Sequence, residues 1–144
     1  SEKGKAPLVA GTRNRRASVC DSGLICAFVA IGLSDETVTG MLNGATGFDY
    51  QPGDLHTIGD RISQVERAFN CREGLVREDD VLPYRLLSEA VPRGPSQDGR
   101  IEDFEAMKDE FYTLCGWDLK TGAPLDERLE ALNVAWVKDI LSTK

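Results

Sequence analysis

The sequence predicts an all-α fold, an irregular domain built from several helices. Apolar residues recur at helical spacing in two long segments, other segments carry helix start and stop signals, and strand patterns are nearly absent. The length of 144 residues fits one domain, so we expect a single helical domain over residues 1–144. Because the chain opens without Met and is already in an apolar pattern by Leu8, we expect it to be a fragment of a longer protein.

The first elements are predicted around a long apolar stretch, Leu24 to Leu33, which we interpret as buried core. A helix is then expected to begin near Ser34, because this N-cap residue is followed by Asp35 and Glu36. It is expected to stop in the glycine-rich stretch 44–47.

Two amphipathic helices follow, one from Pro52 to Asn70 and one from Arg100 to Gly116. The apolar stripe of the first is Leu55, Ile58, Ile62, Val65 and Phe69. The stripe of the second is Ile101, Phe104, Met107, Phe111 and Leu114. Pro52 suits a first helical turn and Gly74 suits a helix exit. Acidic residues at the start of the second helix, Glu102, Asp103 and Glu105, complement its dipole.

The chain is expected to finish in two short helices, around Leu125–Leu132 and Val134–Leu141. Between the amphipathic helices, residues 92–99 are rich in proline and glycine and are predicted to form a loop.

The charge balance excludes some partners. The formal net charge is −7, which argues against nucleic acid, because phosphates require a basic face. A local basic cluster of Arg13, Arg15 and Arg16 is interpreted as a solvated or salt-bridging turn, with an anion site as the less favoured alternative. No apolar run approaches the roughly 20 residues of a membrane-spanning helix, so no membrane partner is expected.

Four cysteines stand at Cys20, Cys26, Cys71 and Cys115. We find no signal region, so a cytoplasmic protein with free thiols is expected. No C-x-x-C pair occurs, so these residues cannot by themselves form a zinc ribbon or a ferredoxin-type cluster. If a metal is involved, most of its ligands lie elsewhere. Cys71 and Cys115 are interpreted as small buried or boundary residues.

No catalytic arrangement is visible. The only histidine, His56, lies off the apolar stripe and is expected at the surface. The acidic cluster Glu78, Asp79 and Asp80 could act as a metal or acid/base site, but a capped turn before Pro83 is favoured.

One segment differs from the rest, Asp21 to Cys26, which places a carboxylate five residues before a cysteine in apolar surroundings. A buried Asp needs a dedicated partner, and the amino and ring N–H groups of a pterin or guanine would supply one. From physics alone, a helix-capping Asp with an inert buried cysteine is the favoured interpretation.

These residues resemble a motif of the tungsten-containing aldehyde:ferredoxin oxidoreductase family, D-x-x-G-L-C, in its C-terminal domain. Asp21 and Cys26 keep the spacing, although Gly23 comes one position early and Leu24-Ile25 replaces Gly-Leu. Further blocks are similar to the family in order along the chain: 42–49, 58–62, 65–70, 72–74, 77–83, 111–118, 122–124 and 129–132. Gln51 departs from the family's Thr or Ser before Pro52, which predicts a weaker helix start.

The resemblance implies that Asp21 binds the pterin of a tungsten or molybdenum bis-pterin cofactor. It also implies a backbone contact at Ile25 and makes Cys26 the last ligand of a four-iron four-sulfur cluster. Family members oxidise aldehydes to carboxylic acids and pass electrons to ferredoxin or another carrier. The expected partners are therefore the upstream domains of the same enzyme and a ferredoxin-like carrier. Two alternatives stay open: a stand-alone helical interaction module without redox role, and a domain of a related aromatic thioester reductase.

The family's pterin-binding base, its other three cluster cysteines and its acid/base residues have no match in these residues. We therefore predict that the isolated chain holds no metal and is inactive, with no catalytic residue of its own. Apolar surface that meets other domains would be exposed, which favours self-association as a homo-oligomer.

Overall fold

The computed structural model describes residues 4–142 and confirms the all-α prediction. Within these residues, extended pairing is limited to one isolated bridge between Trp117 and Pro124. In chain order the elements are α1 (Lys5–Arg16), the π-helix η1 (Ala17–Ser22), α2 (Ala27–Ala30), α3 (Asp35–Thr46), α4 (Asp54–Arg72), the 3-10 helix η2 (Arg77–Asp79), α5 (Tyr84–Ser88), α6 (Phe104–Cys115), α7 (Asp126–Ala131) and α8 (Val137–Ser142).

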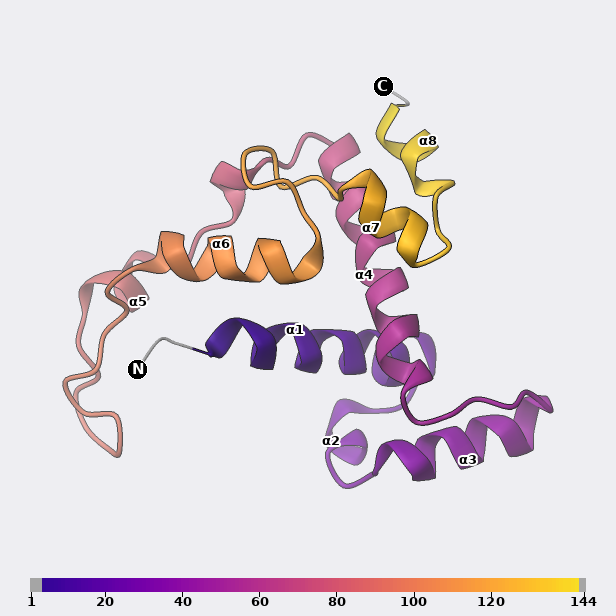
Figure 1. Cartoon of the computed structure of the whole chain (residues 1–144). Helices are drawn as coiled ribbons and strands as arrows, with labels where there is room; N and C mark the ends of the chain where they lie inside the picture. Colours follow the sequence, from indigo (N-terminus) through magenta and orange to yellow (C-terminus); the bar gives the residue numbers. More distant parts are fainter. Residues whose placement is uncertain (1–3, 143–144) are drawn as a thin grey trace.

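Helix α4 organises the molecule, because α1, η1 and α8 all pack against it. In Figure 1, α4 rises from the end of α3 toward α7 and α8. Helix α1 crosses near its lower half, with α6 on one side of α1 and the α2–α3 segment on the other. No helix of residues 4–142 has both the length and the apolar content needed to cross a membrane.

The predicted helix ends are largely confirmed. The Ser34 hydroxyl accepts a hydrogen bond from the Thr37 amide at 3.3 Å, and α3 ends at Gly47 with a left-handed φ of 75°. Helix α4 has no side-chain cap at its start, as expected from Gln51. Helix α6 begins later than predicted, because the Asp103 carboxylate accepts from the Ala106 amide at 2.9 Å and so caps the helix there.

Helix α1 was missed by the sequence analysis. Its three closely spaced arginines were interpreted as a turn, but they form its last helical turn. Cationic side chains are favourable there because they interact with the negative end of the helix dipole.

The burial of α4 differs from the predicted apolar stripe. Leu55 is buried, but Phe69 at the other end of the stripe is 49% exposed. The buried face instead contains Asp60, Gln64 and Arg67. Polar side chains lie inside this structure because each finds partners on α6, α7 or the segments between helices.

Buried apolar residues gather in separate clusters rather than one large core. Within residues 4–142 these clusters are Ala68, Leu129, Leu132, Val134 and Val137; Val19, Ala30, Val38 and Leu55; and Tyr112, Cys115 and Trp117. Each contacts or includes a residue of α4 or α6, so these two helices connect the clusters.

The prediction that Leu24–Leu33 forms buried core is wrong for this chain. Leu24, Phe28 and Ile31 are 88%, 87% and 80% exposed, whereas Ala30 is buried. Helix α2 has only four residues, and the side that carries Ala30 is the one that packs inward. Ile25 and Leu33 are partly buried against the same cluster as Ala30, whereas Leu24, Phe28 and Ile31 are left uncovered by the described residues.

Candidate functional site

The segment from Asp21 to Cys26 begins inside the π-helix and ends at the start of α2. The Gly23 amide donates to the Ser18 carbonyl at 3.2 Å, and a Cβ at Gly23 would lie 2.6 Å from the Val19 carbonyl oxygen. Only glycine fits this turn without a shift of the backbone. π-turns of this kind occur often at functional sites.

After Gly23 the chain reverses at Leu24, whose φ of 56° is in the left-handed region. For a residue other than glycine, this backbone conformation costs free energy. Such strained residues are found most often at functional sites. Asp21 and Cys26 therefore do not share one helical turn. The two residues lie on either side of a strained turn, and α2 starts only after Cys26.

The side chains of the predicted site residues differ in their surroundings. Asp21 is not buried: its side chain is 53% exposed, and its nearest cation is Arg16, with Nε 3.9 Å from Oδ2. A contact of that length between exposed groups is weak. The Cys26 thiol is also exposed. Ile25, in contrast, packs its side chain against the cluster that contains Val19.

Ile25 can therefore offer its backbone, but not its side chain, to a bound group, which is the role that the resemblance implies. The carboxylate of Asp21 and the thiol of Cys26 remain accessible. Ile25 thus holds the segment against the Val19 cluster, while the side chains of Asp21 and Cys26 face solvent.

Arg15 is the residue that fixes this segment, and sequence reasoning missed it. Its Nε donates to Asp35 Oδ1 at 2.7 Å, and its Nη groups donate to the carbonyls of Ala30 at 3.3 Å and Leu33 at 2.6 Å. One guanidinium thus ties the end of α1 to the end of α2 and the start of α3. A run of three arginines gave no signal that its middle member has this role.

Within the described residues, the segment does not form a metal site by itself. Among residues 4–142, no group of three or more His, Cys, Asp or Glu side chains is placed to hold an ion. Cys26 would therefore be one ligand among others supplied from outside this chain. The exposed apolar residues Leu24 and Phe28, on either side of it, would become buried if another part of the protein brought those ligands.

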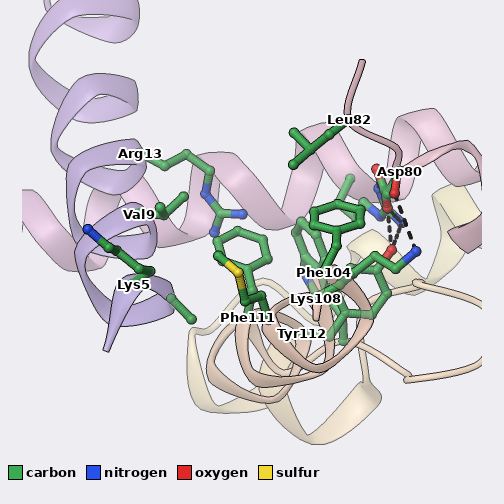
Figure 2. Close-up of a pocket in the computed structure, with 13 residues that line it drawn as sticks. Lys5, Val9, Arg13, Asp80, Leu82, Phe104, Lys108, Phe111 and Tyr112 are labelled. Atoms are coloured by element: carbon green, nitrogen blue, oxygen red, sulfur yellow. Dashed lines mark hydrogen bonds and ion pairs between the residues drawn. The ribbon is translucent and has the colours of Figure 1, made fainter. Parts of the chain in front are cut away.

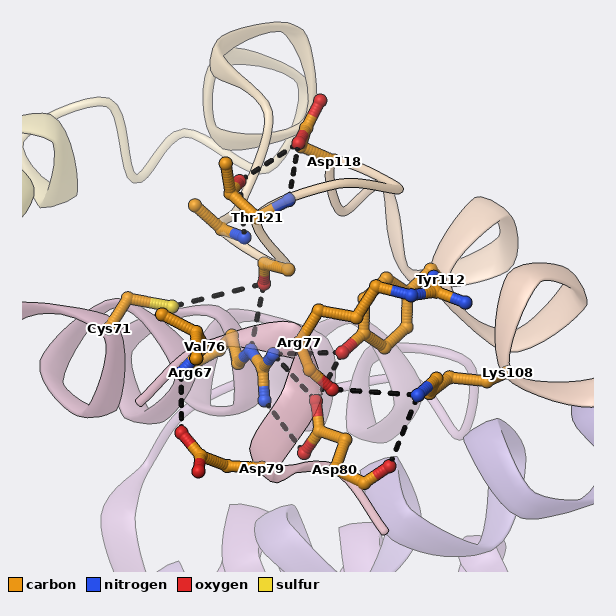
Figure 3. A network of polar contacts seen from close by, with 12 residues as sticks. Arg67, Cys71, Val76, Arg77, Asp79, Asp80, Lys108, Tyr112, Asp118 and Thr121 are labelled. Atoms are coloured by element: carbon orange, nitrogen blue, oxygen red, sulfur yellow. Dashed lines mark hydrogen bonds and ion pairs between the residues drawn. The ribbon is translucent and has the colours of Figure 1, made fainter. Parts of the chain in front are cut away.

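A second polar region lies on α4, α6 and η2, and Figure 3 shows its centre. The Arg67 guanidinium pairs with Asp80, Nη2 to Oδ2 at 2.7 Å, and donates to the Gly122 carbonyl at 2.8 Å and the Tyr112 hydroxyl at 3.0 Å. The Tyr112 hydroxyl donates in turn to Asp80. Gly122 has a φ of 75°, and a Cβ there would lie 2.2 Å from Arg67 Nη2, so glycine is required.

Burial and pairing shift the pKa values of this network. Burial raises the pKa of Tyr112 to about 12, and its hydrogen bond to Asp80 adds to the rise. Burial alone would raise the pKa of Asp80, but hydrogen bonds from Arg67 and Tyr112 outweigh it and hold that pKa below its usual value. Asp80 is therefore the counter-ion of Arg67, a role that the predicted capped turn did not include.

A neighbouring set of contacts extends the buried polar region along α4. The Gln64 side chain, fully buried, donates to Asp60 Oδ1 and the Cys115 carbonyl, each at 2.9 Å. It accepts from Trp117 Nε1 at 2.9 Å. Asp60 also pairs with Arg128 of α7. Both ends of the Gln64 amide are thus satisfied by groups from different elements.

The remaining predicted residues have structural roles. His56 is exposed and lies 3.5 Å from Asp35. The Asp79 carboxylate accepts from the Val76 amide at 2.9 Å, which confirms the capped turn. All cysteines are free thiols, with Cys115 buried and Cys71 half-buried as expected.

The sequence matches a known family over nearly its whole length. The family described as "Aldehyde ferredoxin oxidoreductase, domains 2 & 3" matches residues 1–134. A tungsten-containing aldehyde ferredoxin oxidoreductase of Pyrococcus horikoshii is 36% identical over 118 residues, which is 81% of this chain and 19% of the relative. The enzymes of the same name from Pyrococcus furiosus and Thermococcus kodakarensis are 37% and 35% identical over 82% and 83% of the chain.

The chain spans about a fifth of the length of these curated relatives, which agrees with its being part of a larger protein. The match runs through the candidate segment, the α4 network and α7, so it does not depend on a short motif. This chain belongs to the aldehyde ferredoxin oxidoreductase family.

Proposed function

We propose that this chain is the C-terminal part of an enzyme that oxidises aldehydes to carboxylic acids with a tungsten or molybdenum bis-pterin cofactor. The enzyme would also hold one four-iron four-sulfur cluster and pass electrons to a ferredoxin-like carrier. The family match over residues 1–134 carries this proposal, together with the name that the relatives share. The exposed Asp21 and Cys26 on an anchored turn support it.

Each residue of the segment has a proposed task. The Asp21 carboxylate accepts hydrogen bonds from the amino and ring N–H groups of one pterin, in a bidentate contact. The Ile25 backbone lies against the same group, and the Cys26 thiolate binds one iron of the cluster. When bound, the pterin-held metal supplies the two-electron chemistry, and this chain positions and encloses it.

Arg15 acts one step away, because it holds α2 and α3 relative to α1 and so sets where Cys26 lies. The exposed Leu24, Phe28 and Ile31 would contact the upstream domains of the same enzyme. Free cysteines support a cytoplasmic location.

The family match argues against a stand-alone interaction module, because that class would not require ordered similarity over the whole length. The relatives' names favour aldehyde oxidation over aromatic thioester reduction. The isolated 144-residue chain is expected to be inactive, since it lacks the other cluster cysteines.

The test uses the full-length protein that contains this chain, purified without oxygen. Asp21→Asn should lower tungsten or molybdenum content and aldehyde-dependent dye reduction by about tenfold or more. Its iron content should stay close to that of the unchanged protein. Glu127→Gln, which makes the same charge change at an exposed position of α7, should leave both unchanged. Full metal content and activity in Asp21→Asn would contradict the assigned role.

A further inference from the structure

A pocket of about 440 Å³ lies between α1, α6 and the segment after η2. Its apolar wall includes Val9, Leu82, Phe104, Met107, Phe111 and Trp117. Asp21, Ile25 and Cys26 do not line it, so it is separate from the candidate cofactor segment. Its volume and its mainly apolar wall are typical of sites for small organic molecules.

Arg13 extends from α1 into this pocket, toward Phe111 (Figure 2). Its guanidinium carbon lies 5.1 Å from the ring centroids of both Phe111 and Trp117. Its Nη2 and Nε donate to the neutral side-chain oxygen of Asn14, at 3.2 and 3.4 Å, and the Cys115 thiol is a further neutral partner. Among residues 4–142, no carboxylate forms an ion pair with it.

The anions near the pocket do not neutralise Arg13. Asp80 is taken up by Arg67 and Tyr112. Burial raises the pKa of the Cys115 thiol by more than the nearby Arg13 lowers it, so this thiol stays neutral at pH 7. The Arg13 guanidinium, partly shielded from water by two rings, therefore faces an apolar space. Among residues 4–142 it has no counter-ion.

Lys5 lines the α1 side of the pocket with Arg13, but its ammonium group is directed away from Arg13 (Figure 2). Lys5, Val9 and Arg13 are four residues apart along α1 and line the pocket together, so they share one face of the helix (Figure 2). Lys108, on the opposite wall, is already paired with Glu105 at 2.9 Å and donates to backbone carbonyls. The unpaired positive charge therefore lies on the α1 side.

We propose that this pocket binds an aromatic monocarboxylate, a ligand site that the family assignment does not supply. The carboxylate would accept two parallel hydrogen bonds from Arg13. The aromatic body would pack against Phe104 and Phe111. Neutral or cationic ligands would leave Arg13 unpaired, and an inorganic anion would leave the apolar wall without contacts.

Calorimetric titration of the full-length protein tests the proposal, with 2-naphthoate as the probe and 2-naphthamide as its neutral counterpart. The carboxylate should bind about tenfold more tightly than the amide, because one charge-assisted contact is worth at least that factor. Arg13→Gln should weaken naphthoate binding about tenfold. Arg93→Gln, the same charge change at an exposed loop position, should leave it unchanged.

A second variant covers the case in which Arg13→Gln does not fold. Val9 is 52% exposed, so Val9→Trp fills the pocket without entering the core and should abolish naphthoate binding. The proposal is wrong if the amide binds as tightly as the carboxylate, or if Val9→Trp retains full affinity. It is also wrong if no naphthoate binds, which would mean that another segment of the full-length protein closes the pocket. None of these readouts uses metal content or activity, so the result is independent of the proposed function.

Discussion

Two regions of this chain differ in which side chains they bury: one buries polar side chains, and the other leaves apolar side chains exposed. The polar-network region, which we define as Asp60, Gln64, Arg67, Asp80 and Tyr112, buries polar side chains and provides each with partners. The exposed arm, residues 21–48, has large apolar side chains at its surface, such as Leu24 and Phe28. In the first region, the hydrogen-bonding groups find their partners within the chain. In the second, the exposed apolar side chains form a surface of the kind that contacts another protein segment.

The difference shows where this chain is self-sufficient. Arg67 alone connects α4 to η2, to α6 and to the turn at Gly122, so the network links segments distant in the sequence. The arm is connected to the rest by Arg15 and a small cluster around Val19, and little of its apolar surface is used. Changes in the network should therefore alter the stability of the chain, and changes in the arm should alter what the chain binds.

The largest effect on stability is expected at the crossing of α1 and α4. A Cβ at Gly59 would lie 1.8 Å from the Asn14 carbonyl oxygen, so Gly59→Ala must force the two helices apart. We expect a loss of about 3 kcal/mol in the free energy of unfolding, measured by denaturant titration of the 144-residue chain.

Gly44→Ala is the matched change in the arm. It also lies within a helix, α3, but nothing approaches its Cβ position within 4 Å. It should stabilise the chain by about 0.5–1 kcal/mol through helix propensity. Equal effects of the two changes would contradict the close packing of α1 on α4.

The next effect comes from breaking the network itself. Arg67→Met removes the partner of Asp80 and the donors to Gly122 and Tyr112, so we expect a loss of about 2 kcal/mol. This value is lower than for a fully buried pair, because the Asp80 side chain is 31% exposed. Arg85→Met breaks an exposed pair with Glu89 and should change stability by less than about 0.5 kcal/mol. A similar loss of stability in both variants would mean that the buried network stabilises the chain no more than an exposed ion pair does.

A smaller effect is expected at Tyr112, and it depends on pH. Because its pKa in the folded chain is about 12, against an ordinary value of 10, its contribution is present below pH 10 and is lost as the pH rises through 12. Tyr112→Phe should cost about 1 kcal/mol at neutral pH through the lost hydrogen bonds. Between pH 10 and 12 the stability of the unchanged chain should fall more steeply than that of the variant. Parallel pH profiles would contradict the assigned shift.

The smallest effect on stability is expected in the exposed arm. Phe28 is 87% exposed, so Phe28→Ser should change the free energy of unfolding by less than about 0.5 kcal/mol. Sedimentation velocity of the 144-residue chain should show less self-association in this variant. Val38→Ser, at a buried position of the same arm, should instead lower stability. Unchanged sedimentation of Phe28→Ser would show that this surface is not the one that associates.

Helix periodicity and capping residues predicted most of the fold. Ser34 and Gly47 delimit α3, and the stripe from Leu55 identified α4 to within two residues at each end. The stripe could not reveal that Asp60, Gln64 and Arg67 are buried, because each has a partner far along the chain, such as Tyr112, which is 45 positions from Arg67. Helix α1 was missed because a helix ending in three arginines has no capping signal of its own.

The candidate site was found from sequence only through its resemblance to the family. Local patterns located Asp21 and Cys26, but they favoured a capping Asp and an inert cysteine. The strained turn at Leu24 and the exposure of both side chains follow from tertiary packing around Val19 and Arg15. No periodicity predicts that an apolar stretch will be left uncovered, since the sequence pattern of a surface that meets another domain is the same as that of a core.

The most direct test of the central claim is the iron content of the full-length protein with Cys26→Ala. Cys20→Ala is the matched control, because Cys20 directly precedes the segment and packs against the cluster around Val19. We predict that Cys26→Ala loses about four irons per chain, with the visible absorbance of the cluster, while Cys20→Ala keeps both. Equal iron in the Cys26→Ala variant and the unchanged protein would contradict the assignment of Cys26 as a cluster ligand.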